Sequence, residues 1–243
     1  MANSKSKFLE LSKKFKILKR LYFFYNIYIR NFKFLKNGTQ FGEDKYIIEL
    51  FDKNFKGKFL DVGCYHPTRH NNTYTMYKSG WSGINIDLNP LTIELFNFMR
   101  PRDININSGV SDTEMEKKLY FIDELNTQNT LDKNQLNFLK NHHNIKDSEI
   151  LEKKIRTRNL NSILDDYKFY NIDFMNLDIE GHELKVLETL DFNKINVKYL
   201  CIEMIEHNKE SILNNEKIKD LLSQNNFKLL KNFSFNFIYK KEN

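Results

Sequence analysis

Four carboxylates close short apolar runs and are placed where they could do chemistry together. Asp61, Asp87, Asp178 and Glu203 each end a hydrophobic segment of the sequence. Acidic side chains are costly to bury, so acids repeated at strand ends favour a polar cleft over a dry core. In an open parallel sheet, ligands bind outside the carboxyl ends of the strands. The sequence therefore predicts a functional site at that edge.

The first two acids are spaced as in a nucleoside-binding site. Gly63 follows Asp61 closely and permits a tight turn and a close approach of the backbone to a ligand. Asp87 ends the next apolar run, where an acid can accept hydrogen bonds from both ribose hydroxyls. The complete G-x-G-x-x-G fingerprint is absent, which argues against NAD and FAD. A glycine turn with a ribose acid and no pyrophosphate loop favours S-adenosylmethionine.

Alternating strands and helices must position these side chains. The apolar patterns predict five strands, at Lys58–Val62, Gly83–Asp87, Ile104–Ser108, Asp173–Asp178 and Lys198–Glu203. Helices are expected at 72–79, at Pro90–Met99 and around Leu184, Leu187 and Leu190, and two aromatic strands, Phe227–Asn232 and Ser234–Tyr239, form a C-terminal hairpin. This order predicts a doubly wound α/β sheet. Residues 123–160 are polar and Asn-rich, and we interpret them as an inserted helical or loop excursion near the site.

Five motifs occur in order along the chain. They are Phe59-Leu-Asp-Val-Gly-Cys-Tyr-His-Pro67, Asn72-Thr-Tyr74, Gly80-Trp-Ser-Gly-Ile-Asn-Ile-Asp-Leu-Asn-Pro90, Arg100-Pro-Arg-Asp103 and Leu177-Asp-Ile-Glu-Gly-His-Glu183. Over about residues 57 to 240, the sequence closely resembles the FkbM family of S-adenosylmethionine-dependent methyltransferases. The resemblance implies a class I methyltransferase (Rossmann-like) fold, with a mostly parallel seven-stranded sheet. It also implies O-methylation of a hydroxyl, usually on a sugar or polyketide.

The resemblance also implies which residues hold the cofactor. It puts Asp61 and Gly63 beside the methionine part, Asp87 on the ribose, Asn72 and Thr73 near the cofactor carboxylate, and Asn107, Ser108 and Asp112 near the adenine. Asn72 and Thr73 have a structural alternative, since they could cap the helix that follows them.

Methyl transfer to a hydroxyl gains from a positioned base and from alignment with the methyl donor. The candidate bases are Asp178, Glu180 and His182, with His66 facing them from the loop after the first strand. Asp178 is also a candidate orienter or cofactor contact. The alternatives for His182 and Glu180 are an exposed helix start and a charge at a helix N-terminus.

A divalent metal could replace the base by acidifying the hydroxyl. Asp178, Glu180, Glu203 and His207 carry suitable oxygen and imidazole ligands, but their spacing is not diagnostic. We therefore predict no metal site. The three prolines, Pro67, Pro90 and Pro101, include none after Asp178, so the Asp/Asn-Pro-Pro-aromatic motif of DNA-base methyltransferases is absent.

The net charge of +6 comes entirely from an N-terminal arm, residues 1–37, which precedes the domain at 38–243. Residues 1–36 hold ten Lys and Arg and one acid, or +9, which leaves −3 for the rest. Nucleic-acid binding by the whole fold is therefore not indicated. Phe8, Leu11, Phe15, Leu18 and Tyr22 predict an amphipathic helix that packs on the body or a second subunit, or lies on anionic lipid.

Neither a signal peptide nor a membrane-spanning segment is recognised, and Cys64 and Cys201 cannot form a disulfide framework. We expect a cytoplasmic enzyme, with the inner face of the membrane as an alternative location. The predicted reaction is O-methylation of a sugar or nucleotide-sugar hydroxyl in surface-glycan (capsule or lipooligosaccharide) biosynthesis. The alternatives are a phosphate-type oxygen or lipid-linked acceptor, and a non-catalytic cofactor-binding scaffold.

Overall fold

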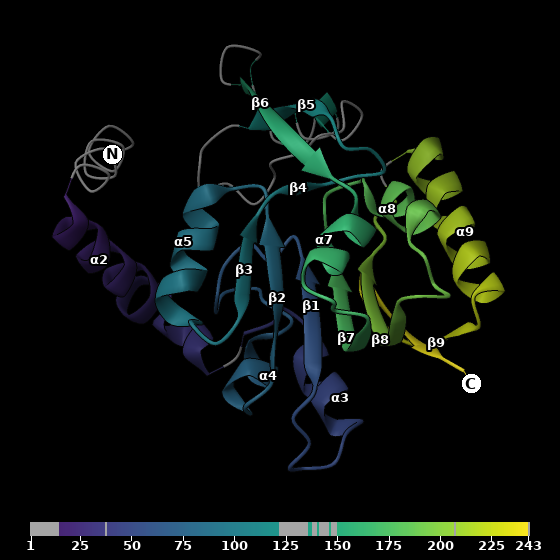
Figure 1. The fold of residues 1–243 in the computed structure, drawn as a ribbon, viewed down its shortest axis with the longest axis horizontal. Helices are drawn as coiled ribbons and strands as arrows, with labels where there is room; N and C mark the ends of the chain where they lie inside the picture. Colours follow the sequence, from purple (N-terminus) through teal and green to yellow (C-terminus); the bar gives the residue numbers. More distant parts are fainter. Residues whose placement is uncertain are drawn as a thin grey trace.

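A seven-stranded sheet forms the centre of the computed structural model, which describes residues 15–36, 38–121, 136–137, 140, 146, 150–206 and 208–242 (Figure 1). Its strands run in the order β3-β2-β1-β7-β8-β10-β9. Their bounds are β1 (Lys58–Val62), β2 (Ser82–Asp87), β3 (Ile104–Asn107), β7 (Asn171–Leu177), β8 (Asn196–Glu203), β9 (Phe227–Phe233) and β10 (Asn236–Lys241).

The first five strands are parallel, and β10 runs antiparallel to both β8 and β9. This confirms the predicted doubly wound, mostly parallel sheet with an antiparallel C-terminal hairpin. The chain builds outward from β1 to β2 and β3 on one side, then crosses to β7 and β8 on the other. The switch point between β1 and β7 is where such sheets bind ligands.

A second, three-stranded sheet follows β3 in the chain, in the order β4-β6-β5. Its strands are β4 (Gly109–Val110), β5 (Glu116–Phe121) and β6 (Leu151–Arg158). The interpretation of 123–160 as helix or loop is therefore wrong for residues 151–158. Of the remainder, residues 136–137, 140, 146, 150 and 159–160 are described. The strand is mostly exposed and lacks the apolar alternation that would have predicted it, and it forms by pairing with β4 and β5.

Different helices cover the two faces of the central sheet. Leu60 and Val62 of β1 point to the face covered by α7 (Leu160–Asp166), α8 (Glu183–Thr189) and α9 (Lys209–Gln224). Phe59 points the opposite way, into a cluster with residues of α3 (Glu43–Glu49) and α4 (Tyr74–Lys78). Asp61 shares that second face, because side chains alternate along a strand. The same face therefore turns polar as β1 reaches its carboxyl end.

Helix α5 (Pro90–Met99) packs on β2 and β3 and has the predicted bounds. Its start is defined locally: the Asn89 side chain accepts the Leu91 N–H at 2.9 Å, and Pro90 occupies the first turn. On its outer side lies α2 (Lys16–Phe24), followed by a π-helical turn (Tyr25–Arg30) and a 3₁₀ turn (Phe32–Leu35) (Figure 1).

The arm packs on the body through a stripe that overlaps the predicted one in part, since Tyr22 also packs against the buried residues. Phe23 and Ile27 are buried against Leu91 and Leu95 of α5. Of the predicted stripe, Leu18 and Tyr22 are half-buried and Phe15 is exposed, while Phe8 and Leu11 lie outside the described residues.

Within the described ranges, no helix has the length and hydropathy needed to cross a bilayer. Cys64 and Cys201 are both buried free thiols.

Candidate active site

The loop after β1 lies directly on the end of β7. Gly63 has a φ of 83°, and its N–H donates to the Ile86 carbonyl at 2.9 Å. A Cβ at this position would lie 1.7 Å from the carbonyl oxygen of Asp178. Gly63 thus closely approaches the main chain at Asp178, directly after β7, and its predicted approach to a ligand stays a prediction. Glycine is required because any side chain would separate the two strand ends.

Asp61 lies at the centre of a buried polar network. Its Oδ2 accepts hydrogen bonds from Thr73 Oγ1 at 2.8 Å and Asn71 Nδ2 at 3.0 Å, and its Oδ1 accepts one from Asn176 Nδ2 at 3.0 Å. Burial raises the pKa of Asp61, while the nearby Arg100 guanidinium opposes that rise. Both carboxylate oxygens are thus engaged inside the protein, which fixes the segment between β1 and α4.

Arg100 ties the same segment together from the end of α5. The side chain is fully buried and donates to the Pro67 carbonyl, to Thr73 Oγ1 at 2.9 Å and to Asn71 Oδ1 at 2.6 Å. Asn72 donates to Asn176 Oδ1 at 2.8 Å. Neither Asn72 nor Thr73 caps α4 with its side chain, so the capping alternative does not hold.

Sequence reasoning missed Asn71, Arg100 and Asn176 as members of this network. The signal available for Arg100 was its place in one of the five quoted motifs, and for Asn71 its position beside Asn72.

Asp87 joins the β1 loop to the end of β2. Its Oδ2 accepts the Tyr65 N–H at 2.9 Å and its Oδ1 accepts the Asn89 N–H at 2.7 Å. Burial raises its pKa to about 6, against the lowering effect of those two bonds. Asn107 Nδ2 and the Ser108 N–H both donate to the Asp87 carbonyl, at 2.9 and 3.0 Å. The structure therefore brings three of the predicted cofactor residues together.

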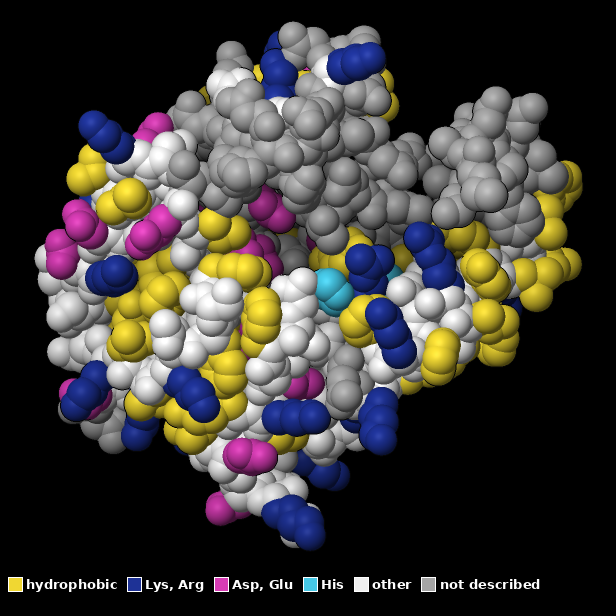
Figure 2. Space-filling model, turned by 180° about the vertical axis from the view of Figure 1, so that it is seen from behind, with side chains coloured by type: hydrophobic (Ala, Val, Ile, Leu, Met, Phe, Trp, Pro, Cys, Tyr) yellow, Lys and Arg dark blue, Asp and Glu magenta, His cyan; other side chains and the backbone are white. Residues whose placement is uncertain are grey.

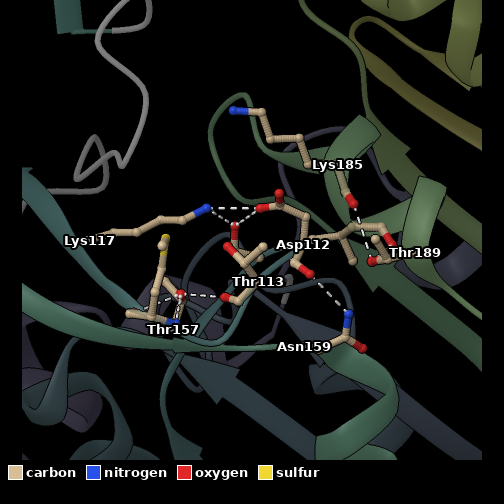
Figure 3. Close-up of polar contacts among 10 residues, drawn as sticks. Asp112, Thr113, Lys117, Thr157, Asn159, Lys185 and Thr189 are labelled. Atoms are coloured by element: carbon tan, nitrogen blue, oxygen red, sulfur yellow. Dashed lines mark hydrogen bonds and ion pairs between the residues drawn. The ribbon is translucent and has the colours of Figure 1, made fainter.

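Asp112 is engaged elsewhere, in the three-stranded sheet. Figure 3 shows the Lys117 ammonium directed at its carboxylate, with the Nζ–Oδ1 distance 2.9 Å. Ser111 Oγ donates to the same oxygen at 2.6 Å. Hydrogen bonds from Lys117 and Ser111 hold the pKa of Asp112 well below its usual range. Asp112 is thus held by an ion pair within the protein, and its place near the adenine stays a prediction.

The segment after β7 folds around the buried carboxylate of Glu183. Glu183 Oε1 accepts the Ile179 N–H at 2.8 Å, and Oε2 accepts the Gly181 N–H at 3.0 Å. Burial raises the pKa of Glu183 to about 7. Glu180, which lies between Ile179 and Gly181, is half-buried and has a φ of 56°. This left-handed conformation is unfavourable for a residue with a side chain. His182 precedes α8 and is buried, not an exposed helix start.

Three acids meet at the ends of β7 and β8. Asp178, Glu183 and Glu203 each have a carboxylate oxygen within 4.8 Å of the other two. Burial, with the nearby Asp61 charge, raises the pKa of Asp178 to about 7, although its hydrogen bond with Glu203 opposes the rise. Burial and the Asp178 charge raise the pKa of Glu203 well above its ordinary value. Like charges this close favour shared protons over three ionised groups.

This acidic group differs from the ligand set considered from sequence. Glu183 takes the place expected for Glu180, and His207 lies outside the described residues. The group has the ligand types for a divalent cation, but nothing else in the described structure points to one, and we assign no metal to it.

His66 does not fit the base role considered from sequence. Its Nδ1 accepts backbone N–H groups from Thr68 at 3.2 Å and Arg69 at 3.0 Å, so the proton belongs on Nε2. Nε2 lies 2.9 Å from Asn26 Oδ1 of the arm and donates to it. Burial and the Arg69 charge lower the pKa of His66 to about 3. His66 is thus a neutral link between the arm and the β1 loop.

The strand order, the glycine turn after β1 and the acid that ends β2 are those of a class I methyltransferase. The particular family follows from the sequence: the chain belongs to the methyltransferase FkbM domain family, whose model matches residues 61–229. The match confirms the resemblance and the enzyme class, and it implies S-adenosylmethionine as the cofactor.

Among solved structures, the chain is similar to a TehB-like SAM-dependent methyltransferase from Corynebacterium glutamicum. The two are 10% identical, with 88% of this chain and 96% of that chain covered and a TM-score of 0.44. No curated protein matches the sequence.

Proposed function

We propose that the protein methylates a hydroxyl of a sugar or nucleotide-sugar, in the biosynthesis of a surface glycan. The observation that carries this proposal is the position of Asp178. Its carboxylate ends β7 at the switch point, and its main chain contacts Gly63 of the β1 loop. A base there stands beside the loop that the family resemblance assigns to the methionine part of the cofactor. Its pKa of about 7 suits proton removal at neutral pH.

The residues present fit S-adenosylmethionine at this edge of the sheet. The Asp87 carboxylate is half-buried and is held in place by two backbone N–H groups, which suits an acceptor for ribose hydroxyls. Asn107 and Ser108 contact Asp87 and could supply polar groups to the adenine of the cofactor. When bound, the cofactor supplies an activated methyl group on a sulfonium.

In the proposed mechanism, Asp178 accepts the proton of the acceptor hydroxyl while the hydroxyl oxygen becomes methylated. Bound S-adenosylmethionine, with its ribose held by Asp87, would supply the methyl group to that hydroxyl oxygen. Glu203, hydrogen-bonded to Asp178, helps to hold the proton until it leaves to solvent. Glu180 is the second candidate base, because its left-handed backbone places an acid beside the same group.

A small pocket of about 60 Å³, with polar and apolar side chains in its lining, lies beside this group and could admit a hydroxyl of the acceptor. Its lining includes Glu203 of β8, Ser211 and Asn214 of α9, and the buried Asn215. Hydroxyl, amide and carboxyl groups can donate to and accept from sugar hydroxyls. In Figure 2 acidic side chains are visible within a hollow near the middle of the view.

Asp87→Ala should weaken S-adenosylmethionine binding by about tenfold or more, because charge-assisted hydrogen bonds to the ribose are lost. Calorimetric titration measures the change. The matched control is Asp191→Ala, since Asp191 Oδ1 also accepts two backbone N–H groups in a turn, from Asn193 and Lys194. If both variants bind the cofactor equally well, Asp87 is not the ribose ligand.

The proposed function is tested by methyl transfer to defined acceptors. The protein is incubated with labelled S-adenosylmethionine and a panel of nucleotide-sugars and oligosaccharides, with and without a chelator. We expect micromolar cofactor binding, label transfer to a hydroxyl of at least one acceptor, and no effect of the chelator. Transfer to phosphate esters but to no sugar hydroxyl would contradict the proposal that the acceptor is a sugar hydroxyl. Transfer that a chelator abolishes would replace the base mechanism with a metal-dependent one.

A further inference from the structure

The face of the arm that points away from α5 is strongly apolar. We define this outer face by eight side chains that are between 39% and 76% exposed: Phe15, Ile17, Leu21, Phe24, Tyr25, Tyr28, Ile29 and Phe32. Ile17, Leu21, Phe24 and Tyr28 recur at helical spacing and form its centre, and the Phe24 and Tyr28 rings are 5.1 Å apart. A patch this large on a folded protein marks an interaction site.

The same arm is densely basic. Lys16, Arg20, Arg30, Lys33 and Lys36 are all exposed, and residues 15–36 contain no acid. Aromatic and aliphatic side chains flanked by Lys and Arg are typical of helices that lie in the interfacial plane of a bilayer. The long basic side chains can reach the headgroups while their methylenes stay with the apolar face. Figure 2 shows hydrophobic and basic side chains intermingled over this edge of the molecule.

The arm is held firmly in one orientation. Phe23 and Ile27 are buried against α5, and Lys19 forms an ion pair with Glu94 of that helix. Asn26 accepts a hydrogen bond from the buried His66 of the β1 loop at 2.9 Å. The outer face is therefore a fixed surface of the protein, and whatever it binds is set at a constant angle to the cofactor loop.

We propose that the outer face of the arm docks the protein onto an anionic lipid surface. A symmetric dimer through this face would bring two arms of net charge +9 together, and their mutual repulsion opposes it. Anionic headgroups instead complement that charge, and the apolar side chains enter the headgroup boundary. This inference is independent of the acceptor, because it concerns only the arm.

The test is sedimentation of the full chain with vesicles. One set contains phosphatidylglycerol and phosphatidylcholine, and the other contains phosphatidylcholine alone. We expect at least about tenfold stronger partitioning onto the anionic vesicles, weakening as salt is raised. The combined variant Ile17→Ser, Leu21→Ser and Phe24→Ser should lose about tenfold or more of this binding. A second variant, Lys16→Glu with Arg20→Glu, should lose the preference for anionic vesicles.

A matched control removes three exposed apolar side chains from α9 and β9, at the opposite edge of the sheet: Ile212→Ser, Leu213→Ser and Leu229→Ser. It should bind like the unaltered protein, and unchanged thermal unfolding checks that each variant is folded. Failure to bind anionic vesicles, equal binding to both vesicle types, or a dimer that the outer-face substitutions dissociate without vesicle binding would each overturn the proposal. None of these readouts depends on methyl transfer, so this test and that of the proposed function fail separately.

Discussion

Asp178→Asn is expected to lower kcat by about 10² to 10⁴-fold, the usual contribution of a positioned general base. Affinity for S-adenosylmethionine should change little, because the substitution keeps the side chain's shape and leaves the main-chain contact with Gly63 in place. Initial rates with an acceptor identified by the transfer assay, combined with calorimetry, separate these two effects. Asp220→Asn on α9 is the control, since it removes one exposed carboxylate and leaves the site untouched.

The pH dependence gives the same prediction a second readout. Because the pKa of Asp178 is about 7, the ionised base is lost as the pH falls through 7, and the rate of the unaltered enzyme should fall with it. Burial and the charges of Asp61, Asp87 and Glu43 keep that pKa raised, while the hydrogen bond with Glu203 opposes the rise. The residual activity of Asp178→Asn should lack this inflection.

As the pH rises, the stability of the folded protein should fall while its activity increases. A carboxyl whose pKa is about 7 when folded and 3.8 in its ordinary state binds protons more tightly in the folded protein. The protein therefore loses stability as the pH rises from about 4 to about 7. Asparagine cannot ionise, so Asp178→Asn should unfold at an equal or higher temperature than the unaltered protein at pH 8. Activity within a few-fold of the unaltered enzyme would instead assign the base to Glu180, which Glu180→Gln would then test.

The central sheet was predictable because its parallel strands are short apolar runs with a helix between them. Helix α5 was predicted with correct bounds since Asn89 and Pro90 mark its start locally. Strand β6 was not, because its stability comes from pairing with β5 and the strand itself is polar. An element is predicted correctly when its own residues carry the pattern, as in α5. It is missed when its stability comes from pairing with another strand, as in β6.

The site followed the same rule. The acids at strand ends were expected to gather, and Asp178 and Glu203 do so. Glu183 joins them because the preceding loop folds back around its carboxylate, and no sequence spacing reveals that. His66 was misread since its partner, Asn26, is 40 residues away on a helix whose packed face was predicted only in part. Contacts between residues far apart in the chain cannot be predicted from a single sequence.

Gly63→Ala should destabilise the protein by at least about 4 kcal/mol and abolish cofactor binding. The new Cβ would lie 1.7 Å from the Asp178 carbonyl oxygen and 2.8 Å from its carbon, and backbone atoms cannot rotate away as a side chain would. The end of β1 must then separate from β7, at the place where the cofactor loop and the proposed base meet. Thermal unfolding and calorimetric titration of the same sample measure both consequences.

Gly42→Ala isolates the contribution of the backbone conformation. Gly42 has a φ of 93°, close to the 83° of Gly63, but a Cβ there would meet nothing within 4 Å. Its substitution should cost only the strain of a left-handed residue, about 1–2 kcal/mol, and leave cofactor binding intact. The difference between the two variants is therefore the cost of separating β1 from β7. Equal losses of stability in the two variants, with cofactor binding retained, would contradict this prediction. The position of Asp178 would then not depend on Gly63.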